Sequence, residues 1–483
     1  MTSLYWADQI ADKIIKEKNK EVYVVASGIT PSGVIHIGNF REEMTVDLVR
    51  RALERKGVKV RYIHSWDDFD RFRKVPAGIP TEFEKYLGLP VTKVPDPFGC
   101  HNSYAEHFEK EFEKGAKEVG VKPEYIYENE KYRKLVYKDK IKLALKNREK
   151  IIEILNRFRK EELPADWYPL TIYCESCGKD FTKITDYDGE YTLKYKCKCG
   201  NEDSVDFSKE GRVKLKWRVD WAMRWSFYDI SFEPGGKEHS TKGGSRDTSK
   251  IISAEVFDFE APIYQMYDFI SLKGFGGKMS GSKGNVVSIK ELSSIYLPEI
   301  VRYFYASTRP KTEFSIPLDD EIFKTYEDFY KCERTFFNAD SFGDPKKDTH
   351  WKRVYEMSVV SETPEELPVQ IPFKYLCYLV QLKKKKKDII EQLEKSKHIE
   401  PTLTEKDSQR ISQIIVSAKN WVNKYAPEEM KFELQKEKLF EPNEHELEAI
   451  KQTVELLEKN FEEDDLYAIG KTTGLKGKYF KLC

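Results

Sequence analysis

Hydrophobic and polar positions in the first 63 residues predict a strand, a helix and a second strand. Residues 21–29 form a short β-branched run around Gly28, which is typical of a buried strand. Segment 39–56 carries apolar residues at helical spacing, and Gly57 is a natural helix stop. Residues 58–63 predict the second strand. This order indicates a parallel sheet, in which ligands lie beyond the carboxyl ends of the strands.

The rest of the chain divides into three stretches by pattern. Residues 70–215 interrupt the alternation with proline-rich loops, a basic helix and a cysteine cluster. Strand and helix patterns resume near 215–275, and from about residue 335 the chain looks helical. We therefore expect an α/β fold with an inserted region, followed by an all-α C-terminal domain.

Composition narrows the class of protein. The 483 residues include 82 Lys and Arg against 82 Asp and Glu, so the formal net charge is zero. Neutrality argues against a general polycationic grip on nucleic acid, including DNA, and leaves local patches open. The chain is 40% hydrophobic and shows neither an apolar signal core nor an apolar run of about 18 residues. We expect a soluble, cytoplasmic protein without a membrane partner.

One such basic patch is predicted at residues 131–160, which hold twelve Lys or Arg and three Asp or Glu, a net charge of +9. An apolar stripe on the predicted helix is formed by Ile141, Leu145, Ile152 and Leu155. One face would pack and the other would present cations to phosphates. The alternative is a solvated lysine-rich helix, and the same alternative holds for the lysine run 383–387.

Four cysteines predict a metal site. Cys174-x-x-Cys177 and Cys197-x-Cys199 have the spacing of a structural Zn²⁺ site in a small ribbon. A second group places four potential ligands within twelve residues: Asp96, Cys100, His101 and His107. Adjacent Cys–His pairs are often incidental, so spacing alone leaves that site open. The isolated Cys332 and Cys377 are expected to be buried small hydrophobic residues.

Two segments carry chemistry suited to a nucleotide, although the chain has no P-loop and no G-x-G-x-x-G. In segment 30–39, TPSGVIHIGN, His36 and Asn39 stand where a loop enters a helix N-terminus, which favours phosphate, and Gly38 permits close approach. Segment 278–285, KMSGSKGN, places two lysines and two serines on a glycine-rich loop. Taken alone, the first segment is a common chance match and the second a solvated turn.

Together and in this order, the two segments resemble the HIGH and KMSKS signatures of class I aminoacyl-tRNA synthetases. The resemblance narrows to the class I lysyl-tRNA synthetase family, found in archaea and some bacteria. It rests on the stretches 64–76 (HSWDDFDRFRKVP), 96–101 (DPFGCH), 217–225 (WRVDWAMRW), 232–239 (FEPGGKEH) and 271–274 (SLKG). It covers about residues 20–300 and continues more weakly through the tail. Gly281 departs from the lysine of KMSKS, and Lys283 follows the motif.

The resemblance implies a lysine–tRNA ligase that uses ATP with Mg²⁺, L-lysine and tRNA(Lys). It implies a Rossmann-like catalytic domain in two halves, 1–75 and 215–290, separated by a zinc-bearing insertion at 76–214 and followed by a connecting region, 291–335, and a helical anticodon-binding domain, 336–483. It also favours zinc at the second cluster. A family member would continue beyond Cys483, so a fragment and a shortened variant are both open.

The expected site residues follow from the motifs and the resemblance. The catalytic residues are His36, Asn39, Lys278 and Lys283. The ATP-binding residues are Ser32, His36, Gly38, Asn39, Lys278, Ser280, Ser282 and Lys283. By resemblance, Gly28, Thr30, Trp221, His239 and Tyr267 line the lysine pocket. Asp67 and Asp68 follow the second predicted strand, where carboxylates could hold an ammonium group.

Each assignment has an alternative. Trp221 and Tyr267 could be core aromatics, Asp67 and Asp68 could cap a helix, and His239 could be an ordinary loop residue. For the whole protein, one alternative is a synthetase paralogue that loads an acceptor other than tRNA. Another is a zinc-ribbon RNA-binding protein that has lost catalysis. The retained His36, Lys278 and Lys283 argue against the second alternative, and the long helical tail argues against the first.

Overall fold

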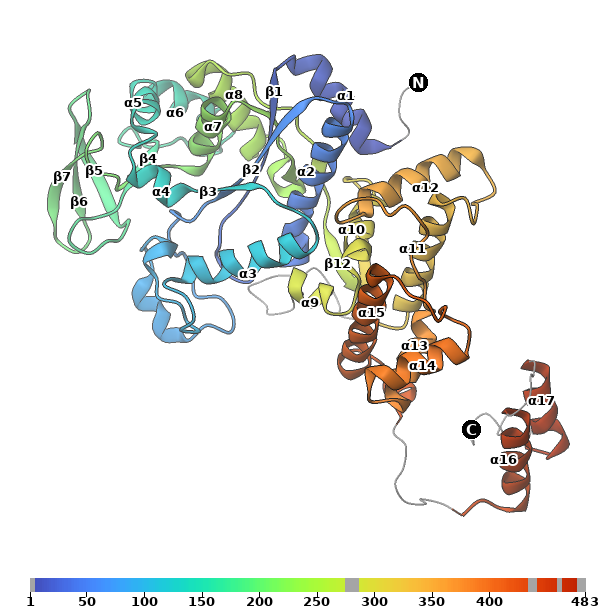
Figure 1. Ribbon diagram of the computed structural model, residues 1–483. Coiled ribbons are helices and arrows are strands. Elements are labelled where there is room, and N and C mark those ends of the chain that lie inside the picture. Colours follow the sequence, from blue (N-terminus) through green and yellow to red (C-terminus); the bar gives the residue numbers. More distant parts are fainter. Residues whose placement is uncertain (1–4, 274–285, 433–440, 458–462, 476–483) are drawn as a thin grey trace. The chain divides into compact units, whose positions relative to one another are not determined.

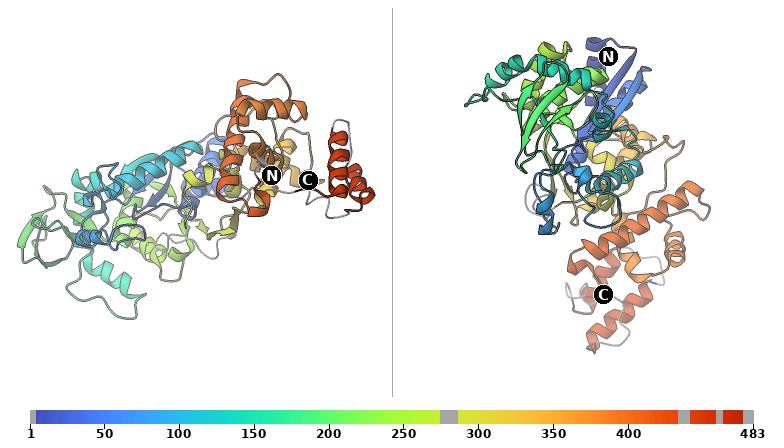
Figure 2. Two further views of the ribbon diagram at one scale, coloured as in Figure 1. Left: turned by 90° about the horizontal axis from the view of Figure 1, so that it is seen from below. Right: turned by 90° about the vertical axis from the view of Figure 1, so that its left-hand side faces the viewer.

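The computed structural model describes residues 5–273, 286–432, 441–457 and 463–475. The chain forms two compact units, Met1–Met430 and Lys431–Cys483. In the larger unit, a parallel sheet is covered by helices, a small three-stranded ribbon lies at one end, and a helical segment lies at the other (Figures 1 and 2).

The central sheet has the order β3–β2–β1–β9. All of its pairings are parallel, which confirms the predicted sheet. Its strands are β1 (Val22–Ile29), β2 (Lys59–Trp66), β3 (Glu124–Tyr127) and β9 (Ile230–Phe232). The predicted helix is α2 (Ile37–Arg55), and Gly57 takes a φ of 77° in the turn before β2, a left-handed conformation that favours glycine. β3 lies inside the range predicted as an insertion, and sequence patterning missed it.

Strand β1 is buried on both faces. Tyr23 and Val25 face a core shared with α1 (Trp6–Lys18) and α2, whereas Val24 and Ala26 face a second core under other helices. Those helices are α5 (Lys138–Lys146), α6 (Arg148–Asn156), α7 (Trp217–Tyr228) and α8 (Ser245–Phe257). Side chains that alternate across a strand therefore serve two layers of helices, which makes a three-layer α/β arrangement (Figure 1).

The basic stretch 131–160 does not form the single helix that we expected. The helix breaks at Asn147, whose Nδ2 donates to the carbonyl oxygen of Leu143 at 2.9 Å, and resumes as α6. Of the predicted stripe, Ile141, Leu145 and Leu155 are buried and Ile152 is only half-buried. Ile151 and Ile154 are fully buried instead, because the break changes which residues face the core.

The remaining elements of the larger unit extend this core. Between β2 and α4 (Glu128–Arg133) come the 3₁₀ helices η1 (Thr81–Tyr86) and η2 (Val91–Lys93) and the helix α3 (Tyr104–Glu118). The region around the four-cysteine cluster contains β4 (Leu170–Ile172), β5 (Thr182–Tyr187), β6 (Thr192–Cys197), β7 (Glu202–Asp206) and β8 (Val213–Leu215). Short elements around the site are β10 (Gly235–Gly236), η3 (Lys237–His239), β11 (Met266–Tyr267), β12 (Ile270–Lys273) and β13 (Phe314–Pro317).

The C-terminal part of this unit is helical, as predicted. It contains α9 (Ile289–Ser293), α10 (Pro298–Ala306), α11 (Ile322–Phe336), α12 (Pro345–Ser358), α13 (Phe373–Leu382), α14 (Lys386–Lys395), α15 (Glu405–Lys424) and η4 (Glu428–Met430). Cys332 and Cys377 are buried in it, as the isolated cysteines were expected to be.

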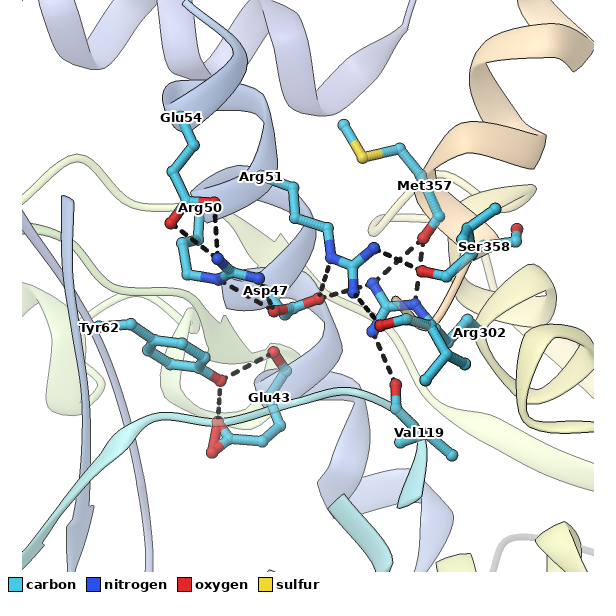
Figure 3. Close-up of polar contacts among 12 residues, drawn as sticks. Glu43, Asp47, Arg50, Arg51, Glu54, Tyr62, Val119, Arg302, Met357 and Ser358 are labelled. Atoms are coloured by element: carbon cyan, nitrogen blue, oxygen red, sulfur yellow. Dashed lines mark hydrogen bonds and ion pairs between the residues drawn. The ribbon is translucent and has the colours of Figure 1, made fainter. Parts of the chain in front are cut away.

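A buried charge cluster joins this helical segment to α2 (Figure 3). Asp47 of α2 accepts hydrogen bonds from Arg50, Arg51 and Arg302. Arg302 also donates to the carbonyl oxygen of Val119, at the end of α3, and to that of Met357 near the end of α12. Arg302 thus gives a hydrogen-bond donor and a positive charge to carbonyl oxygens at the C-terminal ends of α3 and α12.

The smaller unit contains α16 (Glu444–Leu457) and α17 (Glu463–Thr472), and Ala449 and Ile469 are buried between them. Across the described residues of both units, no helix is both long enough and apolar enough to cross a membrane.

Candidate active site

The loop that follows β1 ends at His36, which caps the N-terminus of α2. The Nδ1 atom of His36 accepts a hydrogen bond from the Gly38 N–H at 3.0 Å, and the Asn39 side chain accepts one from the His36 N–H at 3.3 Å. Because Nδ1 is an acceptor, the proton of a neutral His36 ring lies on Nε2. The motif residues therefore order the N-terminus of α2, where N–H groups and the helix dipole favour a phosphate.

The second motif joins this helix start through its C-terminal flank. The Ile37 N–H donates to the Val287 carbonyl oxygen at 3.0 Å, and His36 forms an antiparallel bridge with Ser288. On its N-terminal flank, β12 pairs with β13. The predicted residues Lys278, Ser280, Ser282 and Lys283 lie outside the described residues. The fold thus brings a flank of one motif into contact with the other motif, although about 240 residues separate them.

A carboxylate that sequence reasoning missed connects two residues of the predicted lysine pocket. Glu42 of α2 accepts hydrogen bonds from the Gly28 N–H at 2.8 Å and from the Tyr267 hydroxyl at 2.7 Å. Burial raises the pKa of Glu42 to about 8, although both hydrogen bonds act in the opposite direction. The only hint in the sequence is its place in the second turn of a helix that starts at the predicted ligand edge.

The next residue of α2, Glu43, anchors the helix to the central sheet. Its carboxylate accepts hydrogen bonds from the hydroxyls of Tyr62, at 2.7 Å, and Ser27, and lies 2.7 Å from Nδ1 of His64. All four side chains are buried. Because Ser27 is on β1 and Tyr62 and His64 are on β2, the cluster fixes α2 against both strands and so helps to position the neighbouring Glu42. Figure 3 shows the contact between Tyr62 and Glu43.

Two further residues of the predicted lysine pocket, Trp221 of α7 and His239, lie beside each other. The rings of Trp217 and Trp221 stack with centroids 5.1 Å apart, and the His239 ring lies 5.9 Å from that of Trp221. Burial lowers the pKa of His239, so this imidazole is neutral at pH 7. Trp221 is only 4% exposed, so it has the packing of a core aromatic as well as a place beside His239.

The carboxylates after β2 are engaged within the protein. Asp67 lies 3.0 Å from Nη1 of Arg224, and both side chains are about 5% exposed. Asp68 accepts a hydrogen bond from the Asn129 N–H in the first turn of α4, and burial raises its pKa well above the usual value. Arg224 therefore already gives Asp67 a cation, and Asp68 plays the alternative role of capping a helix start. Their predicted contact with lysine stays a prediction.

Both predicted metal clusters are assembled. The Sγ atoms of Cys174 and Cys199 are 3.8 Å apart, and those of Cys177 and Cys197 are 3.7 Å apart. Four thiolates at a zinc–sulfur distance of about 2.3 Å in tetrahedral geometry would be about 3.8 Å apart. The ligand atoms of this cluster all lie within 4.8 Å of one another, so the donor set and its spacing fit Zn²⁺.

The second cluster has the same compactness and a mixed donor set. The Sγ atom of Cys100 lies 3.1 Å from Nδ1 of His101 and 3.3 Å from Nδ1 of His107. An oxygen of Asp96 lies 3.4 Å from Nδ1 of His107, and the four ligand atoms lie within 4.8 Å of one another. Nitrogen, sulfur and oxygen ligands at these separations suit zinc. Folding therefore supplies the proximity that spacing alone could not establish.

A family model described as "tRNA synthetases class I (K)" matches residues 4–361. The chain belongs to this family. It is 44% identical to the lysine–tRNA ligase of Pyrococcus horikoshii, over 98% of this chain and 92% of that protein. It is 41% identical to the lysine–tRNA ligase of Borrelia garinii, over 99% of this chain and 93% of that protein. The family assignment confirms the predicted class of enzyme and its use of ATP with Mg²⁺.

Among solved structures, a protein described as an arginyl-tRNA synthetase, from Campylobacter jejuni, aligns with a TM-score of 0.35 and 12% identity, covering 87% of this chain and 98% of that one. The family assignment rests on the family model and the curated relatives. Within this class I synthetase, the predicted Gly28 lies near the end of β1 and Thr30 on the loop that follows it. The predicted His36, Gly38 and Asn39 lie at the start of α2. Their individual roles stay predictions.

Proposed function

We propose that the protein is a lysine–tRNA ligase, which activates L-lysine with ATP and transfers the lysyl group to tRNA(Lys) in the cytoplasm. The observation that carries the proposal is the Glu42 carboxylate, held by Gly28 and Tyr267 beside the capped start of α2. A half-buried carboxylate next to a phosphate-binding helix end suits a substrate that has ammonium groups and reacts with ATP. The similarity to curated lysine–tRNA ligases supports the same substrate.

In the first step, the lysine carboxylate attacks the α-phosphorus of ATP and pyrophosphate leaves. A carboxylate is already a nucleophile, so this step needs alignment and stabilisation of charge rather than a general base. His36 would donate from Nε2 and the N–H groups of α2 would face the phosphates. Lys278, Lys283, Ser280 and Ser282 would supply further cations and donors. Mg²⁺ bound with ATP neutralises part of the triphosphate charge.

Lysine would be held through its ammonium groups and its stem. Ionised Glu42 would accept from one ammonium group, because its two hydrogen bonds already fix the carboxylate in place. Trp221 would line the aliphatic stem and offer its face to a cation. His239 is neutral at pH 7 and so does not repel the positively charged substrate.

In the second step, the terminal ribose of tRNA(Lys) takes the lysyl group, on the 2′-hydroxyl as the class implies. The helical segment α11–α15 would bind the anticodon side of the tRNA, and the cations of 131–160 would meet phosphates. Part of that charge is already used, since Lys142 pairs with Glu190 and Arg157 with Glu153. Two Zn²⁺ ions would hold the ribbon and the loop before α3 in place and take no part in the chemistry.

The test is amino-acid-dependent ATP–pyrophosphate exchange, followed by aminoacylation of total tRNA. We expect exchange with lysine alone among the twenty amino acids, and charging of tRNA(Lys). Exchange without charging would favour a paralogue that loads another acceptor. Absence of exchange with every amino acid would contradict the proposal and favour a catalytically inactive RNA-binding protein.

A further inference from the structure

A cavity opens beside the predicted adenylate site, and cations stand along one of its sides. Its volume is about 260 Å³, and it lies between the loop after β1 and the segment after β2. The residues that line it are Thr30, Ser32, Asp70, Arg71, Phe72, Arg73, Lys74 and Val91. Thr30 belongs to the predicted lysine pocket and Ser32 to the predicted ATP site, so the cavity borders the place where lysyl-adenylate would form.

The charge of the cavity is positive. Its one lining carboxylate, Asp70, lies 2.7 Å from the buried Nζ of Lys214, so its charge is already balanced. Arg73 approaches Asp70 only to 3.7 Å, and its side chain is 66% exposed. Within the described part of the chain, no carboxylate pairs with Lys74. Two exposed cations therefore remain to attract an anion.

The walls of the cavity are held by the fold. Arg71 lies 3.2 Å from Asp180, whose side chain is 5% exposed. On the opposite wall, the Tyr104 hydroxyl donates to the Ser32 carbonyl oxygen at 3.0 Å. Phe72 and Val91 are buried and form an apolar floor. The cavity therefore has walls fixed by the fold, and the side chains of Arg73 and Lys74 beside it are exposed.

We propose that this cavity binds a backbone phosphate of the single-stranded 3′ end of tRNA, just before the terminal adenosine. This inference rests on the proposed function. Ligand pockets for whole small molecules usually measure about 300–1,000 Å³, so this recess suits a phosphate with its sugar. The terminal ribose must reach the adenylate, and the phosphates next along the strand then pass the adjoining surface. Lys74 offers a compact ammonium group and Arg73 a planar guanidinium, and both can contact the negative charge of a phosphodiester.

ATP and pyrophosphate also carry phosphate groups, so the experiment must distinguish binding of the tRNA backbone from binding of ATP or pyrophosphate. The variant is Lys74→Gln, and its matched control is Lys93→Gln, an exposed lysine on η2 that does not line the cavity. Lysine-dependent ATP–pyrophosphate exchange is measured with the KM for ATP and for pyrophosphate. Aminoacylation is measured as kcat/KM for tRNA over a series of KCl concentrations.

We expect Lys74→Gln to leave exchange within about twofold of wild type and to lower kcat/KM for tRNA about tenfold. The slope of log kcat/KM against log[KCl] should become shallower by about 0.7, the value for one lost contact with a single strand. Lys93→Gln should change neither quantity. In a second arm, tRNA carries a neutral methylphosphonate at each of its last three linkages in turn. One linkage should lower kcat/KM in wild type and have no added effect in Lys74→Gln.

A raised KM for ATP or pyrophosphate in Lys74→Gln would assign the cavity to the nucleotide and overturn the inference. So would equal losses in both variants, or methylphosphonate effects that simply add to the effect of the substitution. The proposed function fails in a different way, because wild-type protein would then show no lysine-dependent exchange or no charging.

Discussion

Nη2 of Arg302 donates to Oδ2 of Asp47 at 2.6 Å, and both side chains are fully buried. Asp47 lies on the helix that begins at His36, and Arg302 lies on α10. The cations around it hold the pKa of Asp47 well below its usual range, although burial acts in the opposite direction. This pair therefore ties α2 to the helical segment (Figure 3).

Replacing Arg302 with methionine should destabilise the larger unit. The substitution leaves Asp47 buried with fewer cations and leaves the Val119 and Met357 carbonyls without their donor, which costs about 3–5 kcal/mol. Thermal unfolding and urea midpoints should both fall. The stability of Arg302→Lys should lie between those of wild type and Arg302→Met. An ammonium keeps the positive charge but cannot reach all three acceptors as the planar guanidinium does.

The control for Arg302→Met is Lys20→Met. Lys20 pairs with Asp229 at 2.5 Å, but these side chains are 34% and 52% exposed. A pair of this kind contributes about 0–1 kcal/mol. Equal losses of stability in the two variants would show that the buried cluster does not hold the junction.

Replacing Glu42 with glutamine should weaken lysine binding. Loss of a charged hydrogen bond of about 2–3 kcal/mol corresponds to an increase of about 30- to 150-fold in the KM for lysine, with little change in the KM for ATP. The measurement is lysine-dependent exchange at pH 8. Glu21→Gln, at an exposed residue just before β1, serves as the control. An unchanged KM for lysine in Glu42→Gln would remove Glu42 from the pocket.

The raised pKa of Glu42 gives the same variant a pH signature. Because the pKa is about 8 and an ammonium group binds the ionised form, the wild-type KM for lysine should fall as pH rises from 6 to 8. The folded pKa lies above the unfolded value of about 4.3. The stability that Glu42 contributes to the wild-type protein is therefore lost as pH rises from about 4 to about 8. Glu42→Gln should show a flat KM over this range. Its melting temperature should exceed that of wild type by more at pH 8 than at pH 5.

Two substitutions at His36 separate catalysis from helix capping. Alanine removes both the ring and the cap, which costs about 1 kcal/mol of stability, whereas asparagine is a good N-cap that lacks the ring. We expect both variants to lower the exchange kcat about 10²- to 10³-fold, the usual effect of losing a donor to a developing charge. Only His36→Ala should also melt earlier. Wild-type exchange in His36→Asn would show that the ring serves the helix alone.

The two metal clusters should be separable by elemental analysis. We expect two equivalents of zinc in the wild-type protein. Cys177→Ser should lose one and Cys100→Ser the other, while Cys377→Ala, at a buried cysteine far from both clusters in sequence, should keep both. Limited proteolysis should then cut within residues 170–215 in Cys177→Ser alone, because thiolate ligation holds that ribbon. Metal-free protein with an intact ribbon would contradict the assignment.

Local patterns predicted the catalytic core with close boundaries. Strand β1 and helix α2 differ from their predicted starts by one and two residues, since β-branched runs and helical spacing are local signals. β3 was missed because four residues, EYIY, are too short to show a pattern. The pattern predicted one helix in the basic stretch because periodicity does not register the turn between α4 and α5 or the break at Asn147.

The site residues, too, could be predicted where their contacts are local and not where their partners lie far away in the sequence. His36 and Asn39 could be named from the chain because their capping contacts lie within three residues of each other. Glu42 could not, because its partners are Gly28 and Tyr267, the second of which is 225 residues away. Asp67 was expected to face a substrate cation, and the structure gives it Arg224, which is 157 residues away.

By itself, the sequence determined the first strand–helix–strand unit, the helical C-terminal part and the residues of the two candidate metal clusters. These depend on the side-chain period and on motif spacing over a few residues. Only the tertiary structure decided which carboxylates receive a protein cation and which stay open to a substrate. It also decided that Asp96, Cys100, His101 and His107 converge and that Lys74 lines a recess. Burial and long-range pairing control those outcomes, and both depend on contacts between segments that lie far apart along the chain.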